Sequence, residues 1–155
     1  MQNKAKKFKN LPKLKKTPSV LLVVAPYYED ITNQLVEGAS EVLLKTNAKI
    51  ELIEVPGALE IPPAINFASR YFSGFVALGC VIRGETSHYT TVTSDSSWGL
   101  SHLSLKGLCI GNGILTVENH SQAIERADPR AQNKGGAAAE ALIYLLAVKE
   151  KFTQH

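Results

Sequence analysis

Cysteines and metal-binding patterns are scarce in this chain of 155 residues. It holds two cysteines, Cys80 and Cys109, which are too few for the disulfide framework of a small secreted domain. Both stand in apolar segments, so we expect buried, reduced thiols and a reducing compartment, the cytoplasm. No acidic pair or cysteine stands near His102 or His120 at the spacing of metal ligands. The sequence therefore predicts no metal centre.

Long apolar runs are missing as well. No stretch approaches the roughly 18 apolar residues that a membrane-spanning helix needs, and the first residues lack the apolar core of a secretory signal. We therefore expect no membrane partner. A hydrophobic content of 45% in a chain of this length is enough for one sizeable core. The expected organisation is one domain over residues 19–155.

Acidic residues are absent from the first 19 residues, which contain seven lysines, no arginine and one aromatic residue, Phe8. Removing these seven charges from the net charge of +3 leaves −4 for the remainder. Nucleic-acid binding by stacking would need more aromatic or arginine side chains than this segment has. We therefore expect residues 1–18 to form a disordered, solubilising tail, and we expect no nucleic-acid partner.

Apolar periodicity predicts strands that alternate with helices. The predicted strands are 19–25 (SVLLVVA), 49–54, 74–82 (GFVALGCVI) and 108–117, the last interrupted by a bend or bulge at 111–113. Asp30 is a plausible N-cap for a first helix that ends near residue 46, and the proline-rich segment 56–63 begins a second helix that runs through Tyr71. Further helices are predicted over 88–105, 121–127 and 135–152.

This alternation predicts an α/β fold, a three-layer α/β/α sandwich around a four-stranded parallel sheet. Polar segments at 26–30, 56–60, 83–88 and 111–113 each follow a strand or interrupt one. Because the strands are parallel, the four segments should meet at the carboxyl edge of the sheet, where open α/β sheets bind ligands.

The segment after strand 74–82 is the richest in ionisable groups, since Arg83, Glu85, Thr86 and His88 crowd a glycine-containing turn. Histidine titrates near neutral pH, so His88 is the candidate for proton transfer, and its place at a helix start favours a bound anion. His88 could equally be a helix-start histidine that satisfies a backbone carbonyl. The turn could cradle an anion through main-chain donors and the Thr86 hydroxyl, and Arg83 could be a structural ion-pair residue.

Other candidates also have two interpretations each. Tyr27 could stack on a flat heterocycle or lie at the edge of the core. Glu60 could accept hydrogen bonds from a substrate or cap the next helix. The basic side chains of Arg126, Arg130 and Lys134 could hold a phosphate or remain solvated surface charges.

Four segments, taken together and in this order, closely resemble the lumazine synthase family over roughly residues 20–152. They are 56–62 (PGALEIP), 79–89 (GCVIRGETSHY), 113–119 (GILTVEN) and 122–127 (QAIERA) with 133–135 (NKG). The resemblance implies a flavodoxin-like fold and a transferase of riboflavin biosynthesis. The implied reaction condenses 5-amino-6-(D-ribitylamino)uracil with 3,4-dihydroxy-2-butanone 4-phosphate and releases phosphate and water, without a metal or organic cofactor.

The resemblance also implies roles for individual residues. His88 would act as general acid/base, and the phosphate would be bound by Arg126 with help from Thr86, the backbone of Gly84 and Glu85, and Lys134. Tyr27 would stack on the pyrimidine ring. The ribityl chain would meet Ala58, Leu59 and Glu60, and the ring pocket would be lined by Cys80, Val81 and Ile82. Asn112 stands where the family usually has a phenylalanine beside the ring, so an amide replaces part of an apolar wall there.

The family builds its sites between neighbouring subunits, so the resemblance implies a homo-oligomer, at least a pentamer, with a decamer or a sixty-subunit shell as larger options. Arg126 and His88 would come from one subunit and Tyr27 and Glu60 from the next, or the reverse. Segment 128–133 lacks the glycine-rich sequence of shell-forming members. The alternatives are a non-catalytic riboflavin- or lumazine-binding relative or shell protein, and an unrelated flavodoxin-like phosphosugar enzyme.

Overall fold

A computed structural model describes residue 8 and residues 10–153 of the chain. Its strands are β1 (Ser19–Val24), β2 (Lys49–Glu54), β3 (Gly74–Ile82) and β4 (Ile110–Val117). Its helices are α1 (Glu29–Leu44), the short 3₁₀ helix η1 (Ala58–Glu60), α2 (Ile61–Ala68), α3 (His88–Leu105), α4 (His120–Ala127) and α5 (Lys134–Phe152). Within the described ranges, no helix is long and apolar enough to cross a bilayer.

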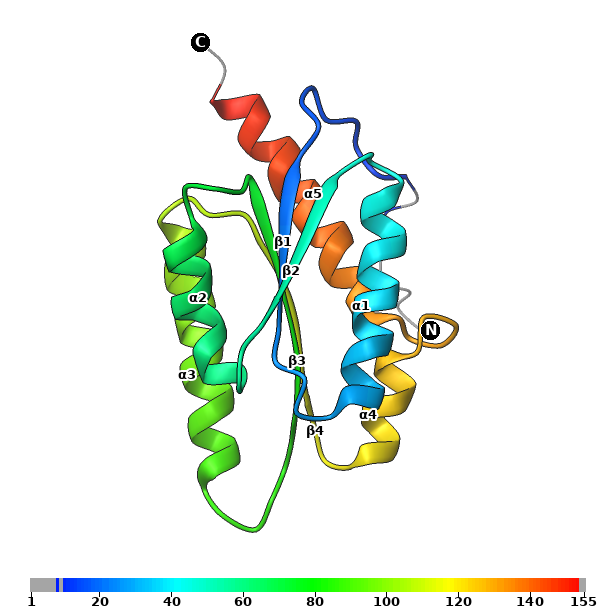
Figure 1. Cartoon of the computed structure of the whole chain (residues 1–155), viewed down its shortest axis with the longest axis vertical. Helices are drawn as coiled ribbons and strands as arrows, with labels where there is room; N and C mark the ends of the chain where they lie inside the picture. The colour runs from blue at the N-terminus through cyan, green and yellow to red at the C-terminus, as the bar shows by residue number, and fades with distance from the viewer. Residues whose placement is uncertain (1–7, 9, 154–155) are drawn as a thin grey trace, which may run out of the picture.

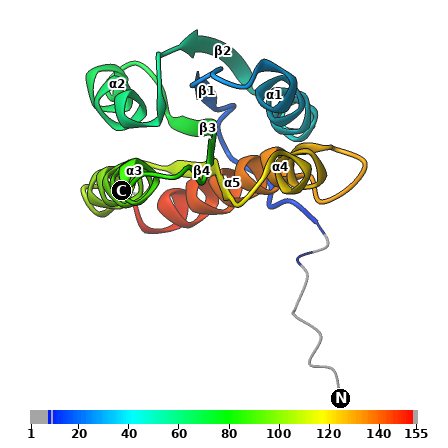
Figure 2. The ribbon, with the colours of Figure 1, turned by 90° about the horizontal axis from the view of Figure 1, so that it is seen from below.

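The strands form one parallel sheet of four in the order β2-β1-β3-β4. Helices α2 and α3 cover one face of this sheet, and α1, α4 and α5 cover the other (Figures 1 and 2). The structure thus confirms the α/β/α sandwich. Every connection from one strand to the next carries at least one helix. Parallel strands require such a crossover, because a tight hairpin reverses the chain and would make the two strands antiparallel.

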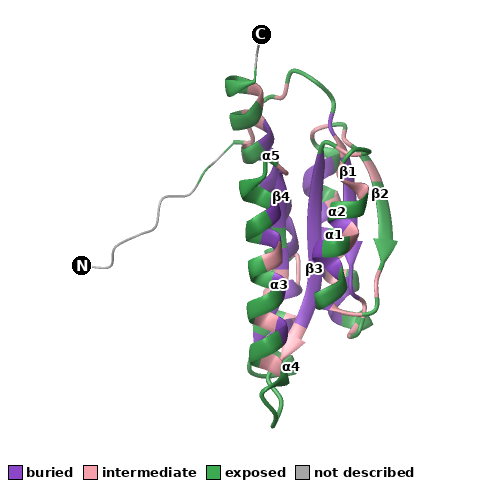
Figure 3. Cartoon of the chain, turned by 90° about the vertical axis from the view of Figure 1, so that its left-hand side faces the viewer, coloured by how far each residue is buried: buried purple, intermediate pink, exposed green. Residues whose placement is uncertain are grey.

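The central strands are buried on both faces, which explains their nearly continuous apolar sequences. In β1, Val20 and Leu22 face the core beneath α1 and α5, while Leu21 and Val23 face the core beneath α2. Figure 3 shows the same burial along β3. Edge strand β2 differs, since Leu52 and Ile53 point to opposite faces and are 44% and 38% exposed. One copy of the chain therefore leaves most of strand β2 exposed, including these two apolar side chains.

The strand order places a topological switch between β1 and β3. From β1 the chain moves outward to β2, and from β3 it moves outward in the opposite direction to β4. At such a switch the two neighbouring loops separate and leave a crevice at the carboxyl ends of the strands. The residues that follow β1 and end β3 therefore lie around the natural ligand site of this sheet.

The interruption predicted at 111–113 is wrong, because β4 runs unbroken and pairs with β3 in one register from Ile110 to Val117. The two glycines serve helix packing instead. A Cβ on Gly111 would lie 2.0 Å from the Ala138 carbonyl oxygen of α5, and one on Gly113 would lie 2.6 Å from the Leu78 side chain. Segment 111–113 is thus no loop, and three of the four expected segments reach the carboxyl edge.

Helix boundaries required two smaller corrections. Asp30 does not cap α1, whose N-cap is Tyr28, and its carboxylate instead accepts a hydrogen bond from His120 Nε2 at 2.9 Å. Helix α2 ends at Ala68 and not beyond Tyr71, because the chain turns over Ser69 and Arg70 before β3. The remaining predicted elements lie within three residues of their observed limits.

Residues 10–18 of the expected tail lie alongside α5. Leu11 and Leu14 pack against the core, and the Tyr144 hydroxyl donates to the Asn10 carbonyl oxygen at 2.6 Å. The Glu150 carboxylate accepts from the backbone N–H groups of Lys15 and Lys16 at distances of 3.0 to 3.3 Å. The rest of the expected tail, residues 1–7 and 9, lies outside the described part of the chain.

Candidate active site

A pocket of about 340 Å³ opens at the switch between β1 and β3. It is lined by residues that follow β1, by the turn before α2, by the end of β3 and by the start of α3. These residues are Ala25, Tyr27, Tyr28, Gly57, Ala58, Leu59, Glu60, Cys80, Val81, Ile82, His88 and Val92. The seven residues expected at the ring and the ribityl chain therefore meet in one cavity with His88, the residue expected to transfer protons.

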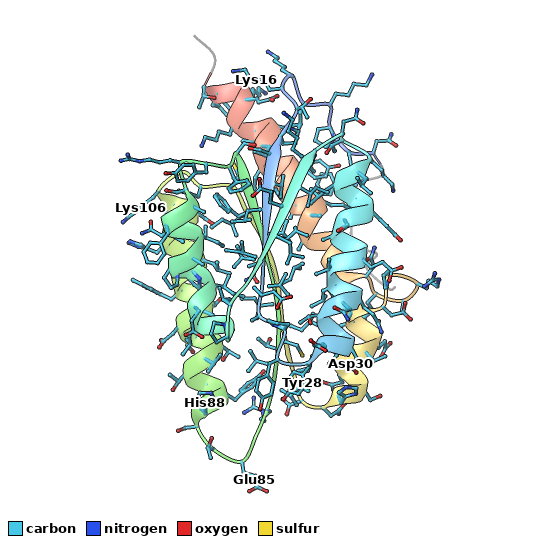
Figure 4. The ribbon with its side chains drawn as sticks, viewed as in Figure 1. Lys16, Tyr28, Asp30, Glu85, His88 and Lys106 are labelled. Atoms are coloured by element: carbon cyan, nitrogen blue, oxygen red, sulfur yellow. The ribbon has the colours of Figure 1, made fainter. Side chains whose placement is uncertain are left out.

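His88 is the first residue of α3 and is exposed at the rim of this pocket. Its backbone N–H donates to the Thr86 hydroxyl oxygen at 3.3 Å, so the imidazole is positioned by a local turn and not by a bond of its own ring. The free N–H groups and positive dipole of a helix start favour an anion nearby. In Figure 4, His88 and Glu85 lie at the same end of the molecule as Tyr28 and Asp30.

Tyr27 presents a flat, open ring to the pocket, with 77% of the residue exposed. One edge is held by Tyr28, whose ring centroid lies 4.8 Å away in a T-shaped contact. Burial raises the pKa of Tyr28, so its phenol remains protonated at neutral pH. The exposed face of Tyr27 is therefore available for stacking on a planar heterocycle.

Glu60 ends η1, and its carboxylate stays near the turn that precedes it. A Cβ built on Gly57 would lie 3.2 Å from Glu60 Oε1, which shows how closely the carboxylate covers this glycine. Glu60 occupies the N-cap position of α2 but makes no capping hydrogen bond with its side chain. The helix-capping interpretation is therefore wrong, and the carboxylate is free to accept hydrogen bonds from hydroxyl groups in the pocket.

Cys80 forms part of the pocket floor as a neutral thiol. Burial, with a smaller contribution from the Asp30 carboxylate, raises its pKa from 9.0 to about 11. Both Cys80 and Cys109 are free and buried, as expected from their apolar segments. A protonated thiol is a poor nucleophile, which suits a residue that lines the pocket more than one that reacts with the substrate.

Alkaline pH should destabilise the fold through this thiol. The pKa of Cys80 in the folded chain lies above its value in the unfolded chain. The contribution of this thiol to the free energy of unfolding is therefore fully present below pH 9 and is lost as the pH rises from about 9 to about 11. Chemical denaturation at pH 8 and pH 11 should therefore show a smaller loss of stability for Cys80→Ala than for the parent chain. Equal losses in both proteins would contradict the buried neutral thiol.

A second hollow of about 330 Å³ lies between β4, α4 and α5. It contains Arg126 of α4, Lys134 at the start of α5, and Asn112 on β4. Asn112 is exposed, and its Oδ1 accepts from the Ile114 backbone N–H at 3.0 Å, which leaves the amide NH₂ as the outward donor. Two cations and an amide donor suit an oxyanion such as phosphate.

The two hollows divide the expected site residues differently from the division suggested by the sequence. Within one copy of the chain, His88 lies with Tyr27 and Glu60, whereas Arg126 lies in the other hollow. Within one copy, His88 and Arg126 therefore do not line the same hollow. Glu85 and Thr86 belong to the exposed turn between β3 and α3 and line neither hollow.

Sequence reasoning missed four pocket residues, Ala25, Tyr28, Gly57 and Val92. Val92 stands four residues after His88, so helical spacing alone places it on the same face. Arg83, whose role the sequence left open, is an ion-pair residue here, because its Nε donates to the Glu118 carboxylate at 3.0 and 3.1 Å. The described residues contain no cluster of three or more side chains suited to a metal ion.

The parallel sheet and the crevice at its switch define an α/β protein with a site for a small molecule, and His88 stands at the rim of that site. The sequence profile of the 6,7-dimethyl-8-ribityllumazine synthase family matches residues 17–150. The chain belongs to this family.

Individual relatives agree with this membership. The 6,7-dimethyl-8-ribityllumazine synthase of Bartonella tribocorum is 51% identical over 146 residues, which cover 92% of this chain and 97% of the relative. The protein of the same name from Jannaschia is 50% identical over 144 residues, which cover 92% of this chain and 81% of the relative. The Zymomonas mobilis protein is 50% identical over 135 residues, with 86% and 97% covered.

Proposed function

We propose that this chain forms 6,7-dimethyl-8-ribityllumazine by condensing 5-amino-6-(D-ribitylamino)uracil with 3,4-dihydroxy-2-butanone 4-phosphate. The reaction releases phosphate and water, and it is the penultimate step of riboflavin biosynthesis. Family membership supports the reaction. The observation that supports its location is that the ring of Tyr27, the carboxylate of Glu60 and the imidazole of His88 meet in one pocket.

The shape of the pocket suits the uracil substrate. Its planar ring would stack on the open face of Tyr27 and lie against Cys80, Val81 and Ile82. The ribityl hydroxyls would then reach the turn formed by Ala58, Leu59 and Glu60, where the Glu60 carboxylate can accept their hydrogen bonds. Ring stacking and hydroxyl recognition would thus come from different residues of the same cavity.

His88 would move the protons that the reaction requires. Imine formation, phosphate elimination, tautomerisation and ring closure need proton transfer and orientation more than a strong nucleophile. The imidazole stands at the pocket rim, and histidine is the side chain that most often transfers protons in general acid–base catalysis. The condensation involves no net oxidation, so we propose no cofactor.

Phosphate binding requires the second hollow, because Arg126 and Lys134 lie there and not beside His88. We infer that the hollow of one subunit faces the pocket of the next and supplies Arg126, Lys134 and Asn112 to it. Thr86 and the Gly84–Glu85 backbone would contact the same phosphate from the pocket side. The uncovered edge strand β2 is consistent with contact between copies.

Subunit mixing tests the shared site. His88→Ala and Arg126→Gln each remove one half, so either variant alone should be weakly active; for Arg126→Gln we expect a loss of about 10-fold to 100-fold. Co-assembly of equal amounts should restore about one quarter of parental activity, the share of sites with both native halves. Each variant reassembled with itself is the control, and no restoration on mixing would contradict a site built from two chains.

A ring of five subunits is the assembly that we propose. Residues 128–133 form a closed turn in which the Asp128 carbonyl oxygen accepts from the N–H groups of Ala131 and Asn133 at 2.9 and 3.0 Å. This turn lacks the glycine-rich sequence expected of shell-forming members. Sedimentation of the active protein should show a pentamer, and an active monomer would contradict the proposal.

The free thiols are consistent with a cytoplasmic location.

Product formation is the direct test of the reaction. Purified protein incubated with both substrates should generate lumazine absorbance and fluorescence faster than the slow uncatalysed reaction in a control without protein. A rate equal to the control, in a protein that still binds riboflavin, would contradict catalysis and favour a flavin-binding role. In that case Asn112, which replaces an apolar wall, is the first residue to exchange.

A further inference from the structure

Arg83 joins the turn that carries His88 to the end of β4. We propose that Arg83 is a positioning residue for catalysis. Its side chain contacts both Glu118 and Tyr89, and these two contacts fix the segment from Gly84 to His88. The mechanistic part of this inference rests on the proposed function, whereas the structural part does not.

The Arg83 side chain makes two kinds of contact at once. Its Nε donates to both carboxylate oxygens of Glu118, at 3.1 and 3.0 Å. Its guanidinium carbon lies 4.4 Å from the ring centroid of Tyr89, in a cation–π geometry. Tyr89 immediately follows His88 in α3, so Arg83 contacts the start of the helix that presents the imidazole.

Glu118 is a fixed anchor for this contact. Its backbone N–H donates to Gln122 Oε1 at 2.8 Å, and the Gln122 backbone N–H donates to the N-cap side chain of Asn119 at 2.9 Å. On the other strand, the backbone N–H of Arg83 donates to the Val117 carbonyl oxygen at 2.9 Å. Main-chain bonds therefore hold both ends of the ion pair.

The turn itself has little else to hold it. Gly84, Glu85, Thr86 and Ser87 are all exposed, and a Cβ added to Gly84 would meet no atom within 4 Å. Its internal bonds are local, such as that from the His88 N–H to the Thr86 hydroxyl. Since a displacement of about 1 Å can cost up to 100-fold in rate, a turn of this kind needs an external restraint.

We do not expect the contacts of Arg83 with Glu118 and Tyr89 to contribute much to the free energy of unfolding. Arg83 and Glu118 are about half exposed, with 51% and 58% of their side chains accessible, and exposed ion pairs contribute little to folding. The pair instead selects one position of the turn. Its loss should therefore change catalysis and local motion while the core beneath β3 and β4 stays intact.

Kinetics of Arg83→Ala and Glu118→Gln should separate positioning from loss of folded protein. We expect kcat/KM to fall about 10-fold to 100-fold, with a raised KM for the butanone phosphate and a KM for the uracil within about twofold of the parent. Loss of folded protein would lower kcat and leave both KM values unchanged. Arg70→Ala is the matched control, because Arg70 is exposed and stands beyond α2.

Charge reversal provides a partial rescue. The double variant Arg83→Glu/Glu118→Arg should recover about threefold in kcat/KM over either single reversal, because the ion pair is rebuilt between the same anchors. It should stay below the parent, because a glutamate at position 83 cannot make the cation–π contact with Tyr89. Single variants within twofold of the parent, or a double variant no better than the singles, would overturn the proposal.

Hydrogen exchange gives a readout that needs no activity. The peptide covering residues 84–94 should take up deuterium several times faster in Arg83→Ala than in the parent, while peptides from β1 and β3 should not change. Equal uptake would overturn the restraint. If the parent forms no lumazine, the proposed function fails, yet this measurement still decides whether Arg83 positions the turn.

Discussion

Replacing His88 by alanine should lower the rate of lumazine formation by about 10² to 10⁴, the usual contribution of a general acid/base. The imidazole stands at the rim of the pocket that Tyr27 also lines, directly after the exposed turn that we propose to contact the phosphate. The Cys80 thiol in the same pocket is a poor replacement, because burial raises its pKa to about 11. Steady-state rates measured by lumazine fluorescence test this expectation.

His102→Ala is the matched control for this experiment. His102 lies in the last turn of the same helix and stacks on Trp98, with ring centroids 5.0 Å apart. It is exposed like His88, but it does not line the pocket. We expect this variant to keep the parental rate within about twofold, as surface substitutions away from a site usually do. A His88→Ala protein within twofold of the parent would count against proton transfer by His88.

Replacing Gly111 by alanine should destabilise the fold by about 3 kcal/mol, the upper end of the usual overpacking cost. The new Cβ would lie 2.0 Å from the Ala138 carbonyl oxygen and 2.8 Å from the carbonyl carbon. These are main-chain atoms of α5, so no side chain can rotate away and the helix itself has to shift. Chemical denaturation should show the loss as a lower midpoint, and the loss is large against a typical stability of about 5 to 15 kcal/mol.

Gly79→Ala is the control on the neighbouring strand. Gly79 is also buried in the sheet, but a Cβ there would meet the Ala25 Cβ at 3.6 Å, which is ordinary van der Waals contact. We expect this change to alter stability by less than about 1 kcal/mol. Equal effects at the two positions would show that β4 and α5 are not packed as closely as described.

Much of the fold could be predicted because its determinants are local. The apolar runs of β1 and β3 indicate strands covered on both faces, and the ranges predicted for β2 and β3 match the observed bounds. The His88 helix was placed correctly because apolar residues recur at helical spacing from Val92 to Leu103. Local periodicity, however, says nothing about which helix approaches which strand.

The treatment of Gly111 and Gly113 shows this limit. Paired glycines in a strand usually indicate a bulge or a ligand, so the sequence predicted a break in β4. The structure instead presses α5 against the strand, where any Cβ would collide with helix or strand atoms. The same pattern of residues fits both outcomes, and only the tertiary contact distinguishes them.

The division of the site was likewise decided in three dimensions. The sequence by itself determined the layer architecture and the identity of the candidate site residues, since short segments carry both kinds of information. The structure decided that His88 lies with Tyr27 and Glu60, and that Arg126 and Lys134 lie in a separate hollow. The physical reason is the strand order, because the switch between β1 and β3 forms one crevice while β4, at the sheet edge, carries the other surface.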